Sequence, residues 1–335
     1  MSADLFPACL DGLPLGLGGA ALGNLYAAVP QAQARELLET AWADGCRCFD
    51  TAPHYGNGLS ERRMGDALRA HPRQDYRLSS KVARLLSADA QAPRDQHGYV
   101  DTLPFVQRWD LSASGIRRSV EDSLQRLGLA RLDAVFLHDI DALTHGERAP
   151  QVLRQVLDEA LPALAQLQGE GLIAGRGLGV NDHRIVMDVL RHADLDAVLL
   201  AGRYTLLDTV AAAQCLPQLQ ARGVAVALGG VFNSGVLAQR LAPDAQATFN
   251  YAAAPPERLQ RALAIQAVCD RHAVALPAAA LQFAMAHPAT GLVLLGPRDA
   301  AQWRQCLEYA RAPVPSALWD ELRHEGLLSP ALPTP

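Results

Sequence analysis

Short apolar runs alternate with segments of helical spacing along nearly the whole chain. A run that is apolar throughout and too short for a helix is typical of a strand that is covered on both faces in a parallel sheet. The pattern therefore indicates a buried parallel sheet. Eight runs of this kind are predicted as strands, at residues 13–20, 46–50, 76–82, 132–137, 173–180, 197–201, 224–228 and 292–295.

The segments between these runs are predicted as helices. In one of them Ala34, Leu37, Leu38 and Ala41 recur at intervals of three and four, and Gly45 ends the segment. The predicted helices cover residues 31–44, 60–70, 112–127, 152–167, 185–191, 210–221, 256–271, 277–286, 300–309 and 317–326. The regular alternation favours the α/β class and a (β/α)8 TIM barrel, formed by residues 1–335 as a single domain.

Two segments depart from the barrel rhythm. Residues 83–111, after the third strand, are rich in Asp, Gln, Gly and Pro and are predicted to be irregular. Loops this long are usually lids, binding loops or disordered. Residues 317–326 follow the last predicted barrel helix and are expected to form one further, C-terminal helix.

Composition and charge exclude several classes of function. The formal net charge is -5, so we expect no nucleic-acid partner. No apolar run reaches the ~18 residues of a membrane span, and residues 1–5 lack the pattern of a signal peptide, so we expect a cytoplasmic protein without membrane contact. The six cysteines form no C-x-x-C pair, which favours reduced thiols over disulfides or a metal site.

One lysine stands out among the basic residues. The chain has 30 Lys and Arg residues, and Lys81 is the only lysine. Lysine is a compact point charge with a tunable pKa, whereas arginine stays protonated and forks. Lys81 ends a predicted strand, the position of many active-site residues in α/β barrels. We therefore interpret it as functional; the alternative is an accidental surface lysine.

Polar residues follow two other predicted strands. Asp50 and His138 lie at strand ends, and Tyr55 lies in the loop just beyond Asp50. Because all strands of a parallel barrel open on one face, these residues and Lys81 are expected to converge. Taken singly, Asp50 could cap a turn, Tyr55 could be a packed aromatic and His138 could belong to a surface pair.

The four residue types suit proton transfer coupled to hydride transfer. The unperturbed pKa of a tyrosine is near ~10, and an ammonium ~4 Å away favours the phenolate by about 4 kcal/mol at an effective dielectric of ~20. Lys81 is therefore expected to bring Tyr55 towards the physiological range, where a general acid-base works best. Asp50 would hold Lys81, and a neutral His138 would donate a hydrogen bond to the reacting oxygen.

These residues carry a resemblance to the aldo-keto reductases that covers almost the whole chain. The signature segment is Phe49-Asp50-Thr51-Ala52-x-x-Tyr55-Gly56, followed by Glu61. Ser80-Lys81 and Leu137-His138 match two further segments of the family. The resemblance implies a (β/α)8 barrel with Asp50, Tyr55, Lys81 and His138 as the catalytic tetrad.

The resemblance also implies a nicotinamide cofactor. Asn181 is expected to bind its carboxamide and Tyr204 to stack on its ring, although the family's serine before Asn181 is missing and Ala201 stands where glutamine is usual. The other expected contacts lie in a loop over the pyrophosphate and at the adenosine end: Gly230, Phe232, Asn233, Ser234, Gly235, Gly296, Arg298, Asp299 and Gln302. Asp299 would repel a 2′-phosphate and accept from a free ribose hydroxyl, which favours NAD, whereas Arg298 favours NADP.

Several phrases resemble the L-fucose/L-galactose dehydrogenase branch, the D-threo-aldose 1-dehydrogenases. They include residues 100–105, 121–128, 138–141, 200–207 and 232–235. The resemblance implies oxidation of the anomeric carbon of a free aldose, of the L-fucose, L-galactose or D-arabinose type, to its lactone. Residues expected to choose the small-molecule substrate are Tyr26, His54, Phe105 and Trp109.

Other functions remain open at this point. Pyridoxal 4-dehydrogenase is a near relative, and a reductase of aldehydes or ketones would use the same tetrad. A barrel that binds nicotinamide without catalysis, as a redox-sensing subunit, is the alternative of another class. A metal-dependent hydrolase is disfavoured because His54, His138 and Asp139 lack a clustered ligand pattern. We expect a monomer or homodimer.

Overall fold

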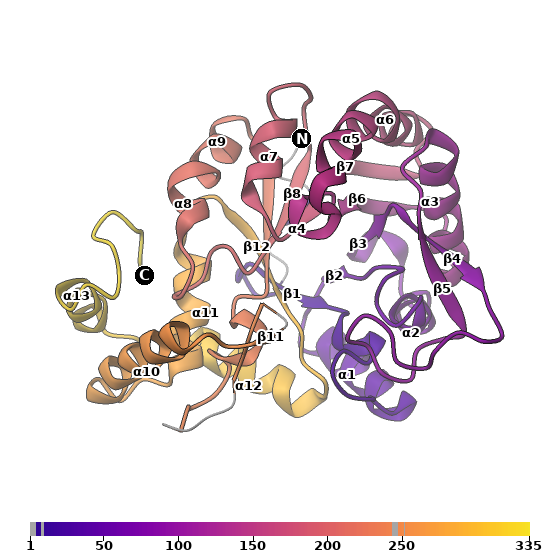
Figure 1. The fold of residues 1–335 in the computed structure, drawn as a ribbon. Coiled ribbons are helices and arrows are strands. Elements are labelled where there is room, and N and C mark those ends of the chain that lie inside the picture. Colours follow the sequence, from indigo (N-terminus) through magenta and orange to yellow (C-terminus); the bar gives the residue numbers. More distant parts are fainter. Residues whose placement is uncertain (1–4, 8–9, 243–246, 251) are drawn as a thin grey trace.

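The computed structural model describes residues 5–7, 10–242, 247–250 and 252–335. Eight parallel strands close into a barrel in the order β1-β12-β9-β8-β7-β6-β3-β2 (Figure 1), which confirms the predicted (β/α)8 architecture. The barrel strands are β1 (Leu15–Gly18), β2 (Cys48–Asp50), β3 (Arg77–Val82), β6 (Leu132–His138), β7 (Ile173–Val180), β8 (Ala197–Ala201), β9 (Ala225–Gly229) and β12 (Thr290–Leu295).

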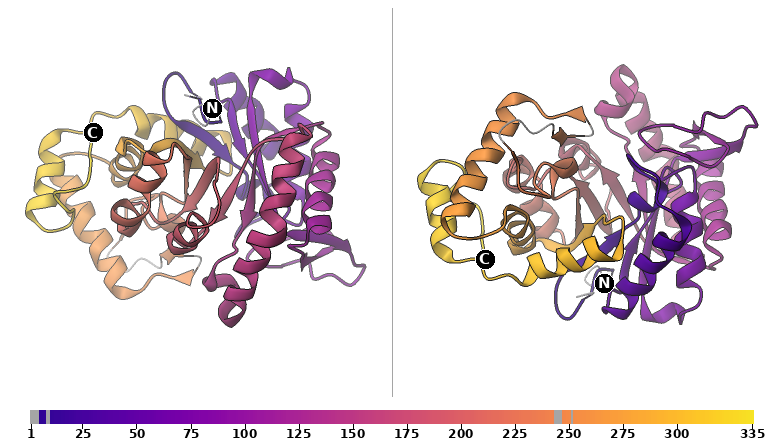
Figure 2. Two further views of the ribbon diagram at one scale, coloured as in Figure 1. Left: turned by 90° about the horizontal axis from the view of Figure 1, so that it is seen from above. Right: turned by 90° about the horizontal axis from the view of Figure 1, so that it is seen from below.

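Helices surround the barrel on its outside (Figures 1 and 2). They are α1 (Gln31–Ala43), α2 (Leu59–Leu68), α3 (Ala113–Leu127), α4 (Ala142–His145), α5 (Ala149–Gln155), α6 (Leu161–Gly169), α7 (His183–Val189), α8 (Val210–Gln214), α9 (Leu216–Ala221), α10 (Pro256–Arg271), α11 (Leu276–Ala286), α12 (Ala300–Arg311) and α13 (Ser316–His324). In the described part of the chain, no helix is long and apolar enough to cross a membrane.

The alternation of side chains along each strand divides the core into two layers. On β6, Leu132, Val135 and Leu137 belong to the large cluster between sheet and helices, whereas Ala134 and Phe136 belong to a smaller cluster inside the barrel. Successive side chains of a strand point to opposite faces, so every second residue is aimed at the barrel axis. This period places the polar residues at the strand ends described below.

The predicted C-terminal helix is confirmed as α13, which lies outside the ring of barrel helices (Figure 1). Its buried residues are Leu318, Trp319 and Leu322, at the spacing of one helical face. They belong to the same apolar cluster as the barrel helices, so hydrophobic burial holds α13 in place.

The segment after the third strand is more regular than predicted. It contains an antiparallel hairpin of β4 (Arg84–Ala88) and β5 (Phe105–Trp109), which lies beside α3 at the edge of the molecule in Figure 1. The prediction of an irregular segment is therefore wrong for these two strands. The Gly- and Pro-containing composition that prompted it belongs to residues 89–104 between them, where it suits a loop. A smaller hairpin joins β10 (Thr248–Phe249) to β11 (Ala252–Ala253).

The cysteines depart in part from the prediction of reduced thiols. Cys46, Cys215, Cys269 and Cys306 are free. Cys48, however, is disulfide-bonded, so the prediction is wrong there, and Cys9 lies outside the described residues.

Candidate active site

Strand alternation brings the three polar strand ends together. Cys48 and Phe136 belong to the cluster inside the barrel, and Asp50 and His138 lie two positions further along the same strands. Lys81 pairs in register with Phe136. All three polar residues therefore point into the carboxyl-terminal mouth of the barrel, as predicted.

A buried ion pair joins two of them. Lys81 Nζ lies 2.6 Å from Asp50 Oδ2 and donates to the carbonyl oxygen of Thr51 at 2.9 Å. The other carboxylate oxygen accepts from Ser79 Oγ at 2.7 Å. Burial raises the pKa of Asp50, while Lys81 and Ser79 act in the opposite direction. With side-chain exposures of 2% and 3%, the pair is held in one geometry before any ligand arrives.

Gly179 on the neighbouring strand packs against Phe136 and the stem of Lys81. A Cβ atom added at Gly179 on β7 would lie 3.6 Å from Cδ and Cε of Lys81 and 3.1 Å from Cβ of Phe136. The last of these distances is too short for most side chains, so a larger residue would displace its neighbours. Gly179 therefore allows the close approach of Phe136 on β6, next to the stem of Lys81.

Tyr55 lies in the loop between β2 and α2. Lys81 Nζ is 4.5 Å from the centroid of its ring. The loop is held from two sides, because the amide of Ser60 donates to the Tyr55 carbonyl at 3.2 Å and a Cβ atom at Gly23 would come within 2.4 Å of the Tyr55 backbone. The structure thus brings the predicted phenol and ammonium together at the same mouth.

His138 completes the group of four. Its ring lies edge-on to Tyr55 with 6.1 Å between centroids, and its Nε2 is 3.5 Å from Asp139 Oδ2. Burial lowers the pKa of His138 well below its usual value, and the cations Arg84 and Lys81 lower it further. A neutral imidazole has one N–H, which can donate a hydrogen bond to an oxygen at the mouth.

One of the four predicted substrate residues, His54, lies beside this group. Its ring centroid is 5.5 Å from that of His138 and 5.2 Å from that of Tyr99. Burial, with Arg84 next, lowers the pKa of His54 to about 3, so the ring is neutral. Tyr99 also stacks on Tyr55 with 6.0 Å between centroids. The loop of residues 89–104 therefore returns to the mouth and forms part of its wall.

Phe105 and Trp109, the two predicted substrate residues on the hairpin, lie at opposite ends of β5. The Trp109 ring lies 4.2 Å from the Arg84 guanidinium and 4.5 Å from the His145 ring. Arg84 also binds Asp139, which follows His138, so Trp109 lies on the rim of the mouth. Phe105 contributes its backbone instead, because its carbonyl accepts from Asn57 Nδ2 at 2.6 Å.

Tyr26 lies next to the loop that carries Tyr99, because its backbone amide donates to the carbonyl of Gly98 at 3.0 Å. Its side chain is 41% exposed and hydrogen-bonds to Ser234, with Arg298 close enough to affect its pKa. Arg298 in turn donates to the carbonyl of Leu25 at 3.3 Å. Both Ser234 and Arg298 are predicted cofactor residues. Tyr26 therefore lies between the loop of residues 89–104 and two residues that are predicted to bind the cofactor, and its role as a substrate residue stays a prediction.

The predicted pyrophosphate loop follows β9 as a tight turn. Gly230, Asn233, Ser234 and Gly235 all have positive φ, at 60°, 45°, 58° and 110°. Asn233 is 2% exposed, and among the described residues its Oδ1 has no hydrogen-bond partner. A buried acceptor without a partner is costly, and a ligand that donates to it would remove that cost.

The predicted adenosine-end residues lie at the start of α12. Asp299 caps the helix, since its Oδ1 accepts from the amide of Gln302 at 2.7 Å. The side chain of Gln302 accepts from the Arg298 amide at 3.0 Å, and Gln33 donates to the Arg298 carbonyl at 2.9 Å. A Cβ atom at Gly296 would meet no atom within 4 Å. The open space at Gly296 and the acceptor of Asn233 on the loop after β9 fit a bound dinucleotide.

The structure does not support the predicted stacking role of Tyr204. Its side chain is 1% exposed, stacks on Phe283 with 4.8 Å between centroids and meets the edge of His287. The ring thus belongs to the packing between barrel and α11, which a short motif could not reveal. Asn181 does follow β7 at the mouth, where its carbonyl accepts from Arg203.

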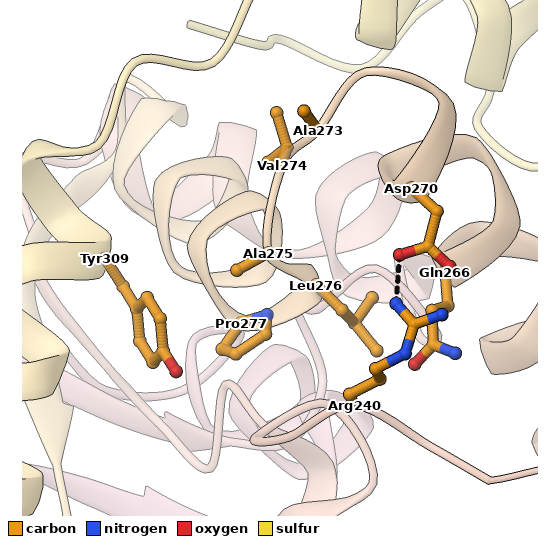
Figure 3. Close-up of a pocket in the computed structure, with 9 residues that line it drawn as sticks. All are labelled: Arg240, Gln266, Asp270, Ala273, Val274, Ala275, Leu276, Pro277 and Tyr309. Atoms are coloured by element: carbon orange, nitrogen blue, oxygen red, sulfur yellow. Dashed lines mark hydrogen bonds and ion pairs between the residues drawn. The ribbon is translucent and has the colours of Figure 1, made fainter.

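A cavity of about 330 Å³ lies apart from this group (Figure 3). Arg240 and Asp270 form an ion pair at one end, and Tyr309 lies at the other. None of the predicted site residues lines the cavity: it is formed by Arg240, Gln266, Asp270, residues 273–277 and Tyr309. Among the described residues, no group of three or more His, Cys, Asp and Glu could hold a metal ion.

Four residues of the mouth were missed by the sequence reasoning: Arg84, Asn57, Tyr99 and Gln107. Asn57 lies in the loop between β2 and α2 that also carries Tyr55, and Arg84, Tyr99 and Gln107 lie in the segment at residues 83–111. For these last three, the only signal in the sequence was the length of that segment, which indicated a binding loop without indicating which residues face the site.

Comparison with known proteins gives a consistent result. The model of the Aldo/keto reductase family matches residues 14–324. Pyridoxal 4-dehydrogenase of Microbacterium luteolum is 42% identical over 327 residues, which cover 94% of each chain. D-threo-aldose 1-dehydrogenase of a Pseudomonas species is 38% identical over 328 residues, which cover 96% of this chain and 95% of that protein.

Among solved structures, the holo form of an aldo-keto reductase from Bacillus halodurans superposes with a TM-score of 0.72. The match covers 95% of this chain and 93% of that one, at 23% identity. At that level of identity the likeness concerns the fold, and it agrees with the closed eight-stranded barrel.

Proposed function

The chain belongs to the aldo/keto reductase family, and from this premise we propose that it oxidises the hemiacetal carbon of a cyclic substrate, the anomeric carbon of a free aldose, to a lactone. One observation carries the proposal: the buried Asp50–Lys81 pair lies beneath Tyr55, with neutral His138 alongside. This arrangement can accept a proton from a hydroxyl group while the attached carbon loses a hydride.

In this mechanism the Tyr55 phenolate is the general base that removes the hydroxyl proton of the substrate. Lys81 stabilises the phenolate electrostatically, and Asp50 holds the ammonium in place. His138 donates a hydrogen bond that orients the same oxygen. A nicotinamide, when bound, accepts the hydride from carbon as the C–O single bond becomes the carbonyl of the lactone.

The residues proposed to hold this cofactor lie on the other side of the mouth. Asn233 offers a buried acceptor, Asn181 lies at the end of β7, and Arg298 and Asp299 lie at the start of α12. We propose a preference for NAD, because the carboxylate of Asp299 disfavours a 2′-phosphate. Arg298 would favour NADP, so the preference depends on which side chain dominates.

The identity of the relatives supports a dehydrogenase that acts on a hemiacetal. Similarity to a D-threo-aldose 1-dehydrogenase supports an aldose as the substrate. Similarity to a pyridoxal 4-dehydrogenase supports pyridoxal as the second candidate. The mouth offers the polar groups of His54, Arg84 and Gln107, which suit a substrate with several hydroxyl groups. Tyr99 and Tyr55 stack on each other, which also gives an aromatic wall.

The test is a panel of initial rates. L-fucose, L-galactose, D-arabinose and pyridoxal are each supplied with NAD⁺ and with NADP⁺, and simple aldehydes are supplied with NADH and NADPH. We expect the highest kcat/KM for one of the aldoses with NAD⁺. Turnover of aldehydes alone would make the protein a reductase, and tight cofactor binding without turnover of any carbonyl would make it a sensor.

A further inference from the structure

A chain of hydrogen bonds links the hairpin to the loop that precedes α2. The Nε2 of Gln107 donates to Asn57 Oδ1 at 2.8 Å, and Asn57 Nδ2 donates to the Phe105 carbonyl at 2.6 Å. The Oε1 of Gln107 accepts from Arg84 Nη1 at 3.2 Å. The same oxygen lies 2.9 Å from Nδ1 of His54.

The chemistry at the two ends of this chain fixes every atom in it. A backbone carbonyl only accepts, so Phe105 requires the NH2 of Asn57, whose oxygen then requires the NH2 of Gln107. A guanidinium only donates, so Arg84 independently requires the oxygen of Gln107 on its side. The Phe105 carbonyl and the Arg84 guanidinium therefore require the same orientation of the Gln107 amide. His54 therefore faces an oxygen, and its Nδ1 must carry the hydrogen.

This tautomer leaves Nε2 of His54 as an acceptor. The ring is neutral because burial and Arg84 oppose protonation. Among the described residues no hydrogen bond reaches Nε2, and the half-buried ring lies 5.5 Å from His138 and 6.3 Å from Tyr55 between centroids. An unpaired acceptor of fixed orientation thus lies beside the two groups that handle the reacting oxygen.

We propose that His54 Nε2 accepts a hydrogen bond from a substrate hydroxyl group on the carbon next to the reacting carbon. His54 is then a specificity-determining residue that selects α-hydroxy hemiacetals and aldehydes. Tyr55 and His138 are engaged by the reacting oxygen, so a second hydroxyl needs a separate acceptor, and His54 provides one. The assignment of the reacting oxygen rests on the proposed function; the tautomer does not.

The kinetic test compares matched substrates. L-fucose is paired with 2-deoxy-L-fucose for oxidation, and glyceraldehyde with 3-hydroxypropanal for reduction. In each pair we expect the wild type to prefer the hydroxylated substrate in kcat/KM, and His54→Phe, which keeps a ring of similar size, to reduce that preference by about 10- to 100-fold. If His54→Phe lowers kcat/KM by the same factor for both members of each pair that reacts, the proposal is overturned.

The second test is independent of turnover. In protein labelled with 15N-histidine, the His54 resonances are those missing from His54→Phe, and their nitrogen shifts report the tautomer. We expect the Nδ1–H form in the wild type and a mixture in Gln107→Leu, which lacks the acceptor. An Nε2–H form in the wild type would overturn the inference. Suppose that no aldose reacts in the rate panel, while the Nδ1–H form is observed and His54→Phe loses the preference for glyceraldehyde. That result would reject only the proposed substrate.

Discussion

On the side of β2, β3 and β6, the barrel mouth is filled with charged and polar side chains that bind one another. The Asp50–Lys81 pair is buried, and Arg84, Asp139 and Gln107 form a second network above it. On the side of β9 and β12, the mouth is lined by a turn of positive φ angles and by the start of a helix. There the acceptor of Asn233 has no partner among the described residues.

This difference separates two tasks. Groups that act on a transition state must be held in place beforehand, because reorganisation during the reaction would raise the barrier. Groups that hold an exchangeable ligand can be left unsatisfied, because the ligand completes their hydrogen bonds. The β2–β3–β6 side therefore suits chemistry, and the β9–β12 side suits binding.

The largest expected effect comes from removing the charge on the chemical side. Lys81→Met keeps the length of the stem and loses the ammonium, so we expect kcat to fall by about 10²- to 10⁴-fold, the usual range for general acid-base catalysis. The Kd of the cofactor, measured by fluorescence titration, should change by only a few-fold. Lys81→Arg is the matched control that keeps the charge without the point-like ammonium. Equal losses in kcat and affinity for Lys81→Met would mean that the two sides are not separate.

The converse change is on the binding side. Asn233→Gly removes the amide and tolerates the φ of 45° at this position. We expect cofactor affinity to fall by about 10-fold, the equivalent of one hydrogen bond of roughly 1.4 kcal/mol, while kcat at saturating cofactor stays within a few-fold. Isothermal titration calorimetry with NAD⁺ and NADP⁺ measures the cofactor affinity. An unchanged Kd would show that the free acceptor is not used by the cofactor.

A smaller effect is expected at the adenosine end. Asp299→Ser retains a side chain that can cap α12 and removes the negative charge, so the fold is preserved. The ratio of kcat/KM for NADP⁺ to that for NAD⁺ should rise by several-fold, because a carboxylate no longer faces the 2′-phosphate. Asp299→Asn serves as a second charge-free cap and should give the same direction. A constant ratio in both variants would mean that Asp299 acts only as a cap.

The smallest effect concerns stability in acid. The pKa of His54 is about 3 in the folded chain and near ~6.5 in an unfolded one, so below pH ~6.5 the unfolded state binds a proton that the folded state does not. His54 therefore contributes to acid destabilisation as pH falls from ~6.5 towards 3. The midpoint of urea unfolding should depend less steeply on pH in His54→Phe than in the wild type. Identical slopes would show that the ring titrates normally in the folded protein.

Residues at strand ends and residues that depend on distant contacts differ in how well the sequence predicted them. Asp50, Lys81 and His138 end strands whose apolar runs are visible in the sequence, and the period of two aims them inward. Tyr204 follows a strand as well, yet it packs against Phe283 on α11, a contact between distant segments. The positions of Tyr26, in a loop, and of Gln107, on β5 of the hairpin, depend on how these segments fold over the mouth, which local spacing does not encode. The barrel could be predicted because it repeats a local pattern; the loop contacts could not.

The central claim is that the Lys81 ammonium, held by Asp50, makes Tyr55 an effective base near neutral pH. The pH dependence of kcat/KM for oxidation tests it directly, with wild type and Lys81→Met compared on the best substrate of the rate panel. The account predicts that the pH of half-maximal rate moves upward in Lys81→Met, towards the ~10 of an ordinary tyrosine. A profile that keeps its shape and falls by the same factor at every pH would contradict it.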